Sequence, residues 1–149
     1  MVSQEVSHAI VEAVRGSALS GYELRLFAMQ QLDTLDTYNW SGIYRLEGSM
    51  LKLDAYVGAA TDHTQIPVGR GVCGTAVAED ANQVIDDVRE LSNYLACSLQ
   101  TRSEIVVLIR KGSEVLGQID IDGHTVGAFD TSDESLLTSL AEVLAERWE

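Results

Sequence analysis

The sequence predicts an α+β fold in which helices at the two ends of the chain flank a central antiparallel sheet. Apolar residues recur at helical spacing near both ends of the chain. Between the ends, two pairs of apolar segments are each separated by a short turn, as in β-hairpins. We expect residues 1–149 to form a single domain, because a chain of 149 residues has the usual size of one.

The first half of the chain predicts two helices and a hairpin. Helical spacing runs over 3–35 and is broken at Gly16–Ser17, so two helices are expected there. Strands are expected at 40–46 and 50–57, because a glycine-containing turn separates these two apolar segments. The loop that follows, 58–69, holds the only proline.

The second half predicts a short helix at 71–78 and a short strand at 83–86. The run 105–109 is continuously apolar, which is typical of a strand covered on both faces, and we expect it to be central in the sheet. Residues 114–122 alternate between apolar and polar side chains, and they are expected to return beside that strand as a second hairpin.

The last helix is expected to start at a capping box. Thr131 is followed three residues later by Glu134, and this spacing lets each side chain bind the backbone of the other. The predicted apolar stripe of this helix consists of Leu136, Leu137, Leu140, Val143 and Leu144.

Composition and charge exclude some classes of partner. Ten Lys and Arg against 23 Asp and Glu give a net charge of −13, which repels nucleic-acid phosphates and anionic lipid head groups. The N-terminal residues lack the basic start and apolar run of a signal peptide, and no segment has the apolar length of a membrane span. We therefore expect a cytoplasmic protein that binds neither nucleic acid nor membrane.

Three carboxylates are candidates for a site. Asp120 and Asp122 are two residues apart on a predicted strand, so they point to the same face of the sheet. Leu116 and Gln118 are expected on that face too, which suggests that another element covers it; the alternative is a solvent-exposed strand face. A covered carboxylate pair binds a cation or shares a proton. Glu104, at the start of the neighbouring strand, could add a third carboxylate.

The two cysteines are the candidate nucleophiles. In a reducing compartment, two cysteines are more often free or catalytic thiols than a structural disulfide. Cys73 lies in the first turn of a predicted helix, where the helix dipole favours a thiolate. Cys97 lies in a loop after an apolar pair. For each of them the alternative is a small, inert, buried residue.

Two further motifs carry little weight. Gly69, Gly71 and Gly74 spell G-x-G-x-x-G, but no clean strand precedes them, and we expect these glycines to serve a tight entry into the helix instead. His63 and His124 do not combine with the two cysteines at a zinc-ligand spacing. We therefore expect no metal site and no bound cofactor.

Five segments of the chain carry a family resemblance: Asn39–Tyr44, Ile66–Ala76, Ala96–Cys97, Ser103–Val106 and Ile119–Asp122. In this order they resemble the free methionine-R-sulfoxide reductases of the GAF-domain superfamily. They extend over nearly the whole chain and imply a GAF-like fold. The family commonly has a cysteine at the position of His63 and an aspartate at that of Ser98, so this chain departs from it at both.

The resemblance implies a role for each candidate residue. It places the catalytic nucleophile at Cys97 and makes Cys73 a candidate resolving thiol. It places substrate binding at the carboxylates and at two aromatic side chains. It further implies free methionine-R-sulfoxide as substrate, thioredoxin as reductant and a homodimeric assembly. The implied substrate-binding residues are Glu104, Asp120, Asp122, Trp40 and Tyr44.

Thiol chemistry fits these residue types independently of the resemblance. A thiolate attacks a sulfoxide sulfur, an acid protonates the departing oxygen, and the resulting sulfenic acid condenses with a second thiol. Two alternatives remain open at this point. One is a GAF domain that binds a small ligand as a sensor, or a reductase relative that has lost activity; the other is a homodimeric interaction module with a vestigial pocket.

Overall fold

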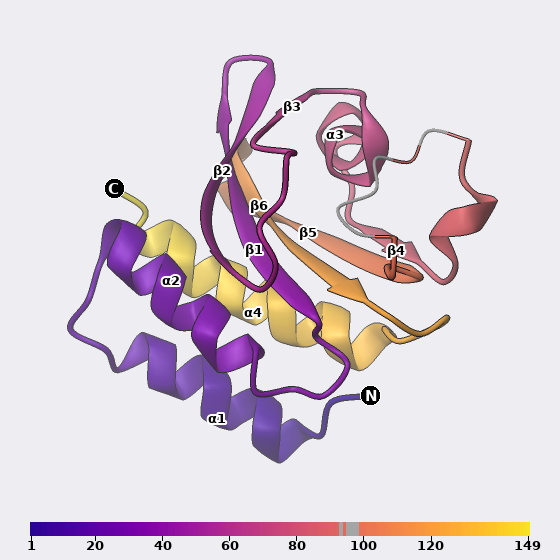
Figure 1. Ribbon diagram of the computed structural model, residues 1–149. Helices are drawn as coiled ribbons and strands as arrows, with labels where there is room; N and C mark the ends of the chain where they lie inside the picture. Colours follow the sequence, from indigo (N-terminus) through magenta and orange to yellow (C-terminus); the bar gives the residue numbers. More distant parts are fainter. Residues whose placement is uncertain (93, 95–98) are drawn as a thin grey trace.

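The computed structural model describes residues 1–92, 94 and 99–149, and its strands form one antiparallel sheet in the order β3-β2-β1-β6-β5-β4 (Figure 1). A single turn of 3-10 helix at Val88–Glu90 lies between β4 and β5. The predicted α+β architecture is confirmed. The elements in chain order are α1 (Gln4–Arg15), α2 (Gly21–Leu32), β1 (Trp40–Glu47), β2 (Met50–Val57), β3 (Gln65–Pro67), α3 (Gly71–Glu79), β4 (Gln83–Ile85), β5 (Ser103–Lys111), β6 (Glu114–Gly123) and α4 (Thr131–Glu146).

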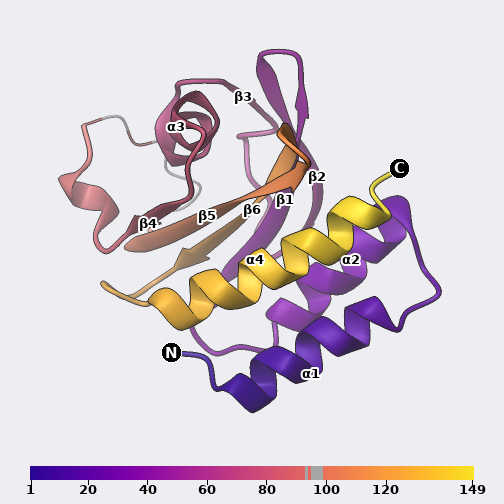
Figure 2. The ribbon, with the colours of Figure 1, turned by 180° about the vertical axis from the view of Figure 1, so that it is seen from behind.

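The sheet separates two hydrophobic cores. Helices α1, α2 and α4 cover one face, as seen from behind in Figure 2, and α3 covers the other. Alternate residues of β5 enter the two cores: Ile105 and Val107 pack against the three long helices, whereas Val106 and Leu108 pack on the α3 side. The continuous apolar run in this strand follows from burial on both faces.

Two details of the sheet differ from the sequence prediction. Strand β5 is not central: it lies between β6 and the short β4, and β1 and β6 occupy the middle of the sheet. The segment expected to be only a loop contains β3, in which Ile66 is buried and pairs with Leu51 of β2. A three-residue strand at a sheet edge has too few residues to create a recognisable alternation.

The capping box of α4 lies one residue earlier than predicted. Asp130, not Thr131, is the N-cap, and its carboxylate accepts from the backbone N–H groups of Ser132 and Asp133. The Asp133 carboxylate in turn accepts from the Asp130 N–H at 2.9 Å. Asp130–Asp133 has the same spacing as Thr131–Glu134, so spacing alone could not choose between the two pairs. The predicted apolar stripe of this helix is buried.

A β-bulge changes the face of the sheet to which one side chain of β6 points. The β5–β6 register shifts between Ile109 and Arg110, and Leu116 is skipped in the pairing. As a result Leu116 packs against the helix-side core, while Gln118 faces α3. The expectation that these two side chains share a face was therefore wrong, because one extra residue reverses the alternation of a strand.

The end of α4 is tied to the α1–α2 connection. The Arg147 guanidinium donates to the carbonyls of Val14, at 2.9 Å, and Ser17, at 2.7 Å, and the Gly21 N–H donates to the Arg147 carbonyl at 2.9 Å. In Figure 1 the C-terminus accordingly lies near the start of α2. These contacts join the first and last helices into one layer.

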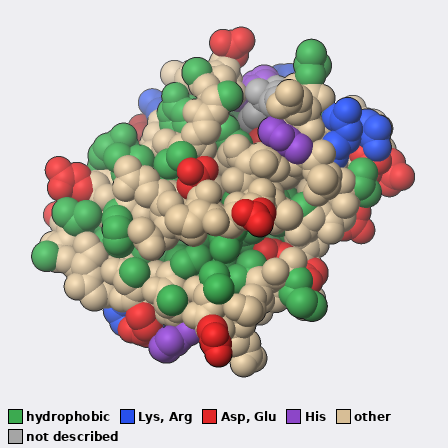
Figure 3. Space-filling view, turned by 60° about the horizontal axis from the view of Figure 1, so that its bottom comes forward, with side chains coloured by type: hydrophobic (Ala, Val, Ile, Leu, Met, Phe, Trp, Pro, Cys, Tyr) green, Lys and Arg blue, Asp and Glu red, His purple; other side chains and the backbone are tan. Residues whose placement is uncertain are grey.

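The surface agrees with the strongly acidic composition. Figure 3 shows acidic side chains at several separate places, around a hydrophobic area in the middle of the face turned up from the bottom of Figure 1. Within the described ranges, none of the helices combines the length and the apolar character needed to cross a membrane.

Candidate active site

The carboxylates lie on one face of the sheet, in two neighbouring cross-strand rows. Trp40 of β1 pairs with Asp122 of β6, which pairs with Glu104 of β5, and Gly42 pairs with Asp120 in the next row on the same face. The prediction that both aspartates share a face is confirmed. This face is covered, because Asp120 is 0% exposed, Asp122 1% and Glu104 4%. An exposed strand face is therefore excluded for these residues.

Helix α3 covers these carboxylates, and two glycines permit its close approach to the sheet. Gly71 begins the helix with a φ of +64°, and a Cβ atom on Gly74 would lie 2.6 Å from the Pro67 carbonyl oxygen. The G-x-G-x-x-G motif thus serves a tight entry, as the sequence predicted. The Gln118 side-chain amide donates to the Cys73 carbonyl at 3.0 Å and fixes α3 on β6, a role that sequence reasoning did not assign to Gln118.

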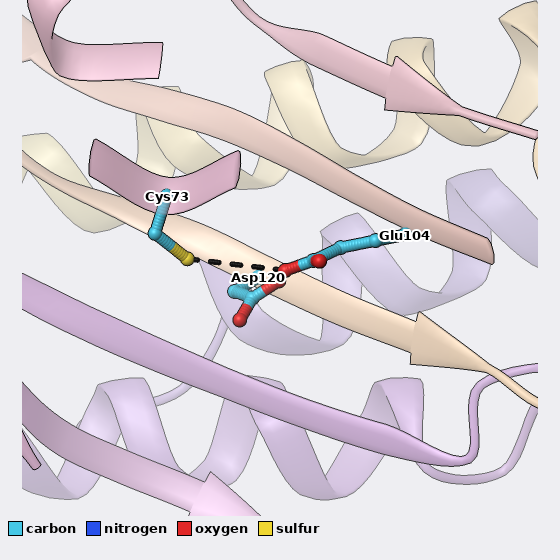
Figure 4. A group of neighbouring side chains, drawn as sticks. All are labelled: Cys73, Glu104 and Asp120. Atoms are coloured by element: carbon cyan, nitrogen blue, oxygen red, sulfur yellow. Dashed lines mark hydrogen bonds between the residues drawn. The ribbon is translucent and has the colours of Figure 1, made fainter. Parts of the chain in front are cut away.

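Cys73 points from α3 toward these carboxylates. Its Sγ lies 3.9 Å from Oε2 of Glu104, and one ligand atom each from Cys73, Glu104 and Asp120 lie within 4.8 Å of one another (Figure 4). All three side chains are buried. The fold therefore joins one predicted cysteine with two predicted carboxylates, although they come from three different elements.

Burial makes an ionised Asp120 costly. Neither of its carboxylate oxygens makes a hydrogen bond of normal geometry with the described residues. Loss of solvation is the main cause that raises the pKa of Asp120, and the neighbouring Glu104 and Cys73 side chains offset this rise only in part. A proton or another positive charge is thus needed among these three groups to stabilise them together.

Trp40 forms an aromatic wall beside the carboxylates. Its ring stacks on Tyr56 at 5.7 Å between centroids and is tilted against Tyr44 at 6.5 Å. Its Nε1–H donates to the Ala59 carbonyl at 3.0 Å. The indole is therefore held in one orientation from several sides.

Two glycines make room for this indole. A Cβ atom on Gly42 would overlap the Trp40 ring, and one on Gly58 would lie 2.7 Å from its Cδ1 atom. Tyr56, which sequence reasoning missed, pairs with Gly42 across the hairpin. Counting back from the hairpin turn would pair Gly42 with Ala55 instead, because the register shifts between Gly42 and Tyr44.

Tyr44 and Cys97 are the remaining predicted site residues. The Tyr44 hydroxyl donates to the His63 carbonyl at 2.8 Å, which fastens the β2–β3 connection to β1. Cys97, the predicted nucleophile, lies outside the described residues. Of the predicted set, the structure thus brings together Cys73, Glu104, Asp120, Asp122, Trp40 and Tyr44 on the α3 side of the sheet.

Comparison with known proteins shows the family to which the chain belongs. A family model described as a GAF domain matches residues 4–148. The free methionine-R-sulfoxide reductase of Escherichia coli is 39% identical over 117 residues, which are 76% of this chain and 70% of that protein.

Solved structures with the same fold include two reductases. A type II free methionine-R-sulfoxide reductase from Thermoplasma acidophilum matches with a TM-score of 0.79 and 38% identity over 92% of this chain and 93% of that one. The reductase from Neisseria meningitidis, solved in complex with its substrate, matches with a TM-score of 0.90 and 27% identity over 99% of this chain and 92% of that one. The chain is a GAF domain and belongs to the free methionine-R-sulfoxide reductase family.

Proposed function

We propose that this protein reduces free methionine-R-sulfoxide to methionine, with Cys97 as the nucleophile. The observation that carries the proposal is the buried cluster of Cys73, Glu104 and Asp120 beside the Trp40 wall. A thiol and carboxyl groups held together in a covered site are the groups that sulfoxide reduction requires. The family relationship supports the same activity.

In the first step the Cys97 thiolate attacks the sulfoxide sulfur, and a carboxyl group of the cluster protonates the sulfoxide oxygen. The oxygen ends on Cys97 as a sulfenic acid, so the Cys97 sulfur is oxidised by two electrons and the substrate sulfur is reduced by two. Three buried carboxyl groups cannot all be ionised at low cost, and one of them therefore retains a proton for this step.

The remaining carboxylates give the site its preference for a free amino acid. An ammonium group forms strong, charge-assisted hydrogen bonds with carboxylates, and a methionine inside a peptide lacks this group. Asp122 and Glu104, which pair across β6 and β5, are the proposed ammonium ligands. The Trp40 wall offers an apolar surface to the methyl end of the side chain.

Recycling completes the reaction. Cys73 condenses with the Cys97 sulfenic acid, releasing water and forming a disulfide. Thioredoxin then reduces this disulfide to two thiols and becomes oxidised itself. No bound cofactor takes part in these steps. The resemblance also implies a homodimer, which analytical ultracentrifugation of the purified protein tests.

A coupled assay tests the proposal. Wild-type protein is supplied with thioredoxin, thioredoxin reductase and NADPH, and NADPH consumption is followed with free methionine-R-sulfoxide, its S epimer or the N-acetylated R epimer. We expect turnover with the free R epimer and at least tenfold slower turnover with the N-acetyl compound, because it has no ammonium group. Tight binding of the free amino acid without NADPH consumption would instead indicate a ligand-binding sensor domain.

A further inference from the structure

The fold creates a donor set for a metal ion that the spacing of histidines and cysteines does not reveal. We propose that Cys73, Glu104 and Asp120 form a binding site for a zinc ion. The three donors come from α3, β5 and β6 and meet only in the folded protein (Figure 4). The two histidines considered from the sequence, His63 and His124, are not part of this set.

The spacing of the donors suits zinc. Zn–S bonds of about 2.3 Å and Zn–O bonds of about 2.0 Å at a tetrahedral angle separate sulfur from oxygen by about 3.5 Å. Sγ of Cys73 and Oε2 of Glu104 are 3.9 Å apart, and ligand atoms of all three residues lie within 4.8 Å of one another. Rotations about side-chain bonds that move these atoms by a few tenths of an ångström to about one ångström bring them to coordination distance. The sheet does not have to move.

A small cavity lies at the cluster. It has a volume of about 10 Å³ and is lined by all three donors together with the residues that begin α3. This is roughly the space of one water molecule, which is enough for an ion. Arg70 also lines the cavity, but it is exposed and its charge is solvated.

The Asp120 side chain is a second, independent indication of a ligand. It is completely buried, and neither carboxylate oxygen makes a hydrogen bond of normal geometry in the described part of the chain. A bound cation satisfies both the charge and the lone pairs of such a group. The net charge of −13 also favours accumulation of cations around the protein.

The chemistry of the donors selects zinc over the common hard cations. A thiolate is a soft ligand, which suits zinc and is poorly suited to Mg²⁺ or Ca²⁺. Those ions also require six or more oxygen ligands, for which this cavity has no room. Binding of zinc releases the Cys73 thiol proton and any proton held by the two carboxyl groups. Three protein ligands leave the fourth tetrahedral position to a water molecule.

Zinc would compete with the activity. This consequence, unlike the site itself, rests on the proposed function: the ion occupies the carboxylates needed for the substrate and ties up the proposed resolving thiol. We expect reversible inhibition by zinc that a chelator removes. Metal binding itself is measured without turnover, so a protein that binds zinc but lacks reductase activity would contradict the proposed function and leave the zinc site standing.

Cobalt titration tests the site directly. Because the chain contains only two cysteines, the Cys97→Ser variant leaves Cys73 as the only thiol. In this reduced variant we expect Co²⁺ to produce a thiolate-to-cobalt charge-transfer band with a stoichiometry of one, and Zn²⁺ to displace it. Adding Cys73→Ser should abolish the band, and adding Glu104→Gln or Asp120→Asn should weaken cobalt binding by about tenfold or more. Glu114→Gln, an exposed carboxylate at the far end of the hairpin, is the matched control and should change nothing.

The outcome decides the proposal. Absence of the charge-transfer band in folded Cys97→Ser protein at saturating Co²⁺ overturns it, and so does a band that survives Cys73→Ser. If the carboxylate variants do not fold, as judged by circular dichroism, the release of protons on zinc addition to the Cys97→Ser protein replaces them as the second measurement. We expect at least one proton per zinc, and no release contradicts thiolate coordination.

Discussion

The indole of Trp40 lies over Gly42, two residues along the same strand, in the space that a side chain at Gly42 would occupy. The glycine on β1 therefore leaves the space that the Trp40 ring occupies. The ring is then fixed by stacking on Tyr56 and by its hydrogen bond to the Ala59 carbonyl.

Replacing this glycine should displace the ring. We expect Gly42→Ala to lower the free energy of unfolding by about 1–3 kcal/mol, because the added methyl group overpacks a buried site. Urea unfolding measures the loss. The Trp148→Phe background leaves Trp40 as the only tryptophan, and its emission should shift to the red. Tyr56→Phe, which retains the stacking face, serves as the control, and equal stability of Gly42→Ala and wild type would contradict the packing described here.

The two cysteine variants should fail in different ways. We expect Cys97→Ser to abolish sulfoxide reduction with the fold intact, because the nucleophile is lost. Cys73→Ser should complete one reduction per protein molecule and then recycle slowly with thioredoxin, because the sulfenic acid lacks its internal partner. Single-turnover measurements of methionine formation distinguish the two variants from each other. Unchanged steady-state turnover of Cys73→Ser would rule out Cys73 as the resolving thiol.

The carboxylates should separate into binding and proton-donating groups. Each of Glu104→Gln, Asp120→Asn and Asp122→Asn removes a charge but keeps the shape, and we expect losses of about 1.5–3 kcal/mol, or about tenfold to a hundredfold, in kcat/KM. Loss of an ammonium ligand should mainly raise KM, whereas loss of the proton donor should lower kcat and flatten one limb of the pH profile. The exposed Glu114→Gln is the control. Wild-type kinetics in all three variants would show that these carboxylates have only a structural role.

The α4 cap should give a pH-dependent contribution to stability. Hydrogen bonds from Ser132 are the main cause that holds the pKa of Asp130 below its ordinary value. The stabilisation is therefore complete above the unfolded-state pKa of about 3.9, and it is lost as the pH falls through the lower folded-state value. At pH 7 we expect Asp130→Ala to cost about 1 kcal/mol, while Thr131→Ala costs much less.

Chemical denaturation of the two cap variants between pH 3 and 7 checks this prediction, because the difference between wild type and Asp130→Ala should shrink below about pH 4. A larger loss for Thr131→Ala than for Asp130→Ala at neutral pH would place the cap where the sequence first suggested it.

Much of the fold could be predicted from the sequence because it depends on local patterns. The two hairpins, the break at Gly16 and the apolar stripe of α4 are all encoded within a few turns or one strand pair. The shared face of Asp120 and Asp122 follows from strand alternation alone. These features needed no information about distant parts of the chain.

The errors arose where one extra residue or a distant partner decides the outcome. The bulge at Leu116 and the register shift after Gly42 each reverse an alternation, and neither leaves a signal in composition. The approach of Cys73 to Asp120 depends on how α3 is placed over β6, and the Gln118 bond to the Cys73 carbonyl helps to fix that placement. Such long-range contacts cannot be read from spacing along the chain.

The joining of the first and last helices has a consequence for synthesis in the cell. Helices α1 and α2 bury their apolar faces largely in a core completed by α4, and Arg147 ties that helix back to the end of α1. On the ribosome, α1 and α2 emerge long before α4, so their apolar faces remain exposed to water while the sheet is still being made. This core can close only after a contact across most of the chain, and we expect this long sequence separation to slow folding.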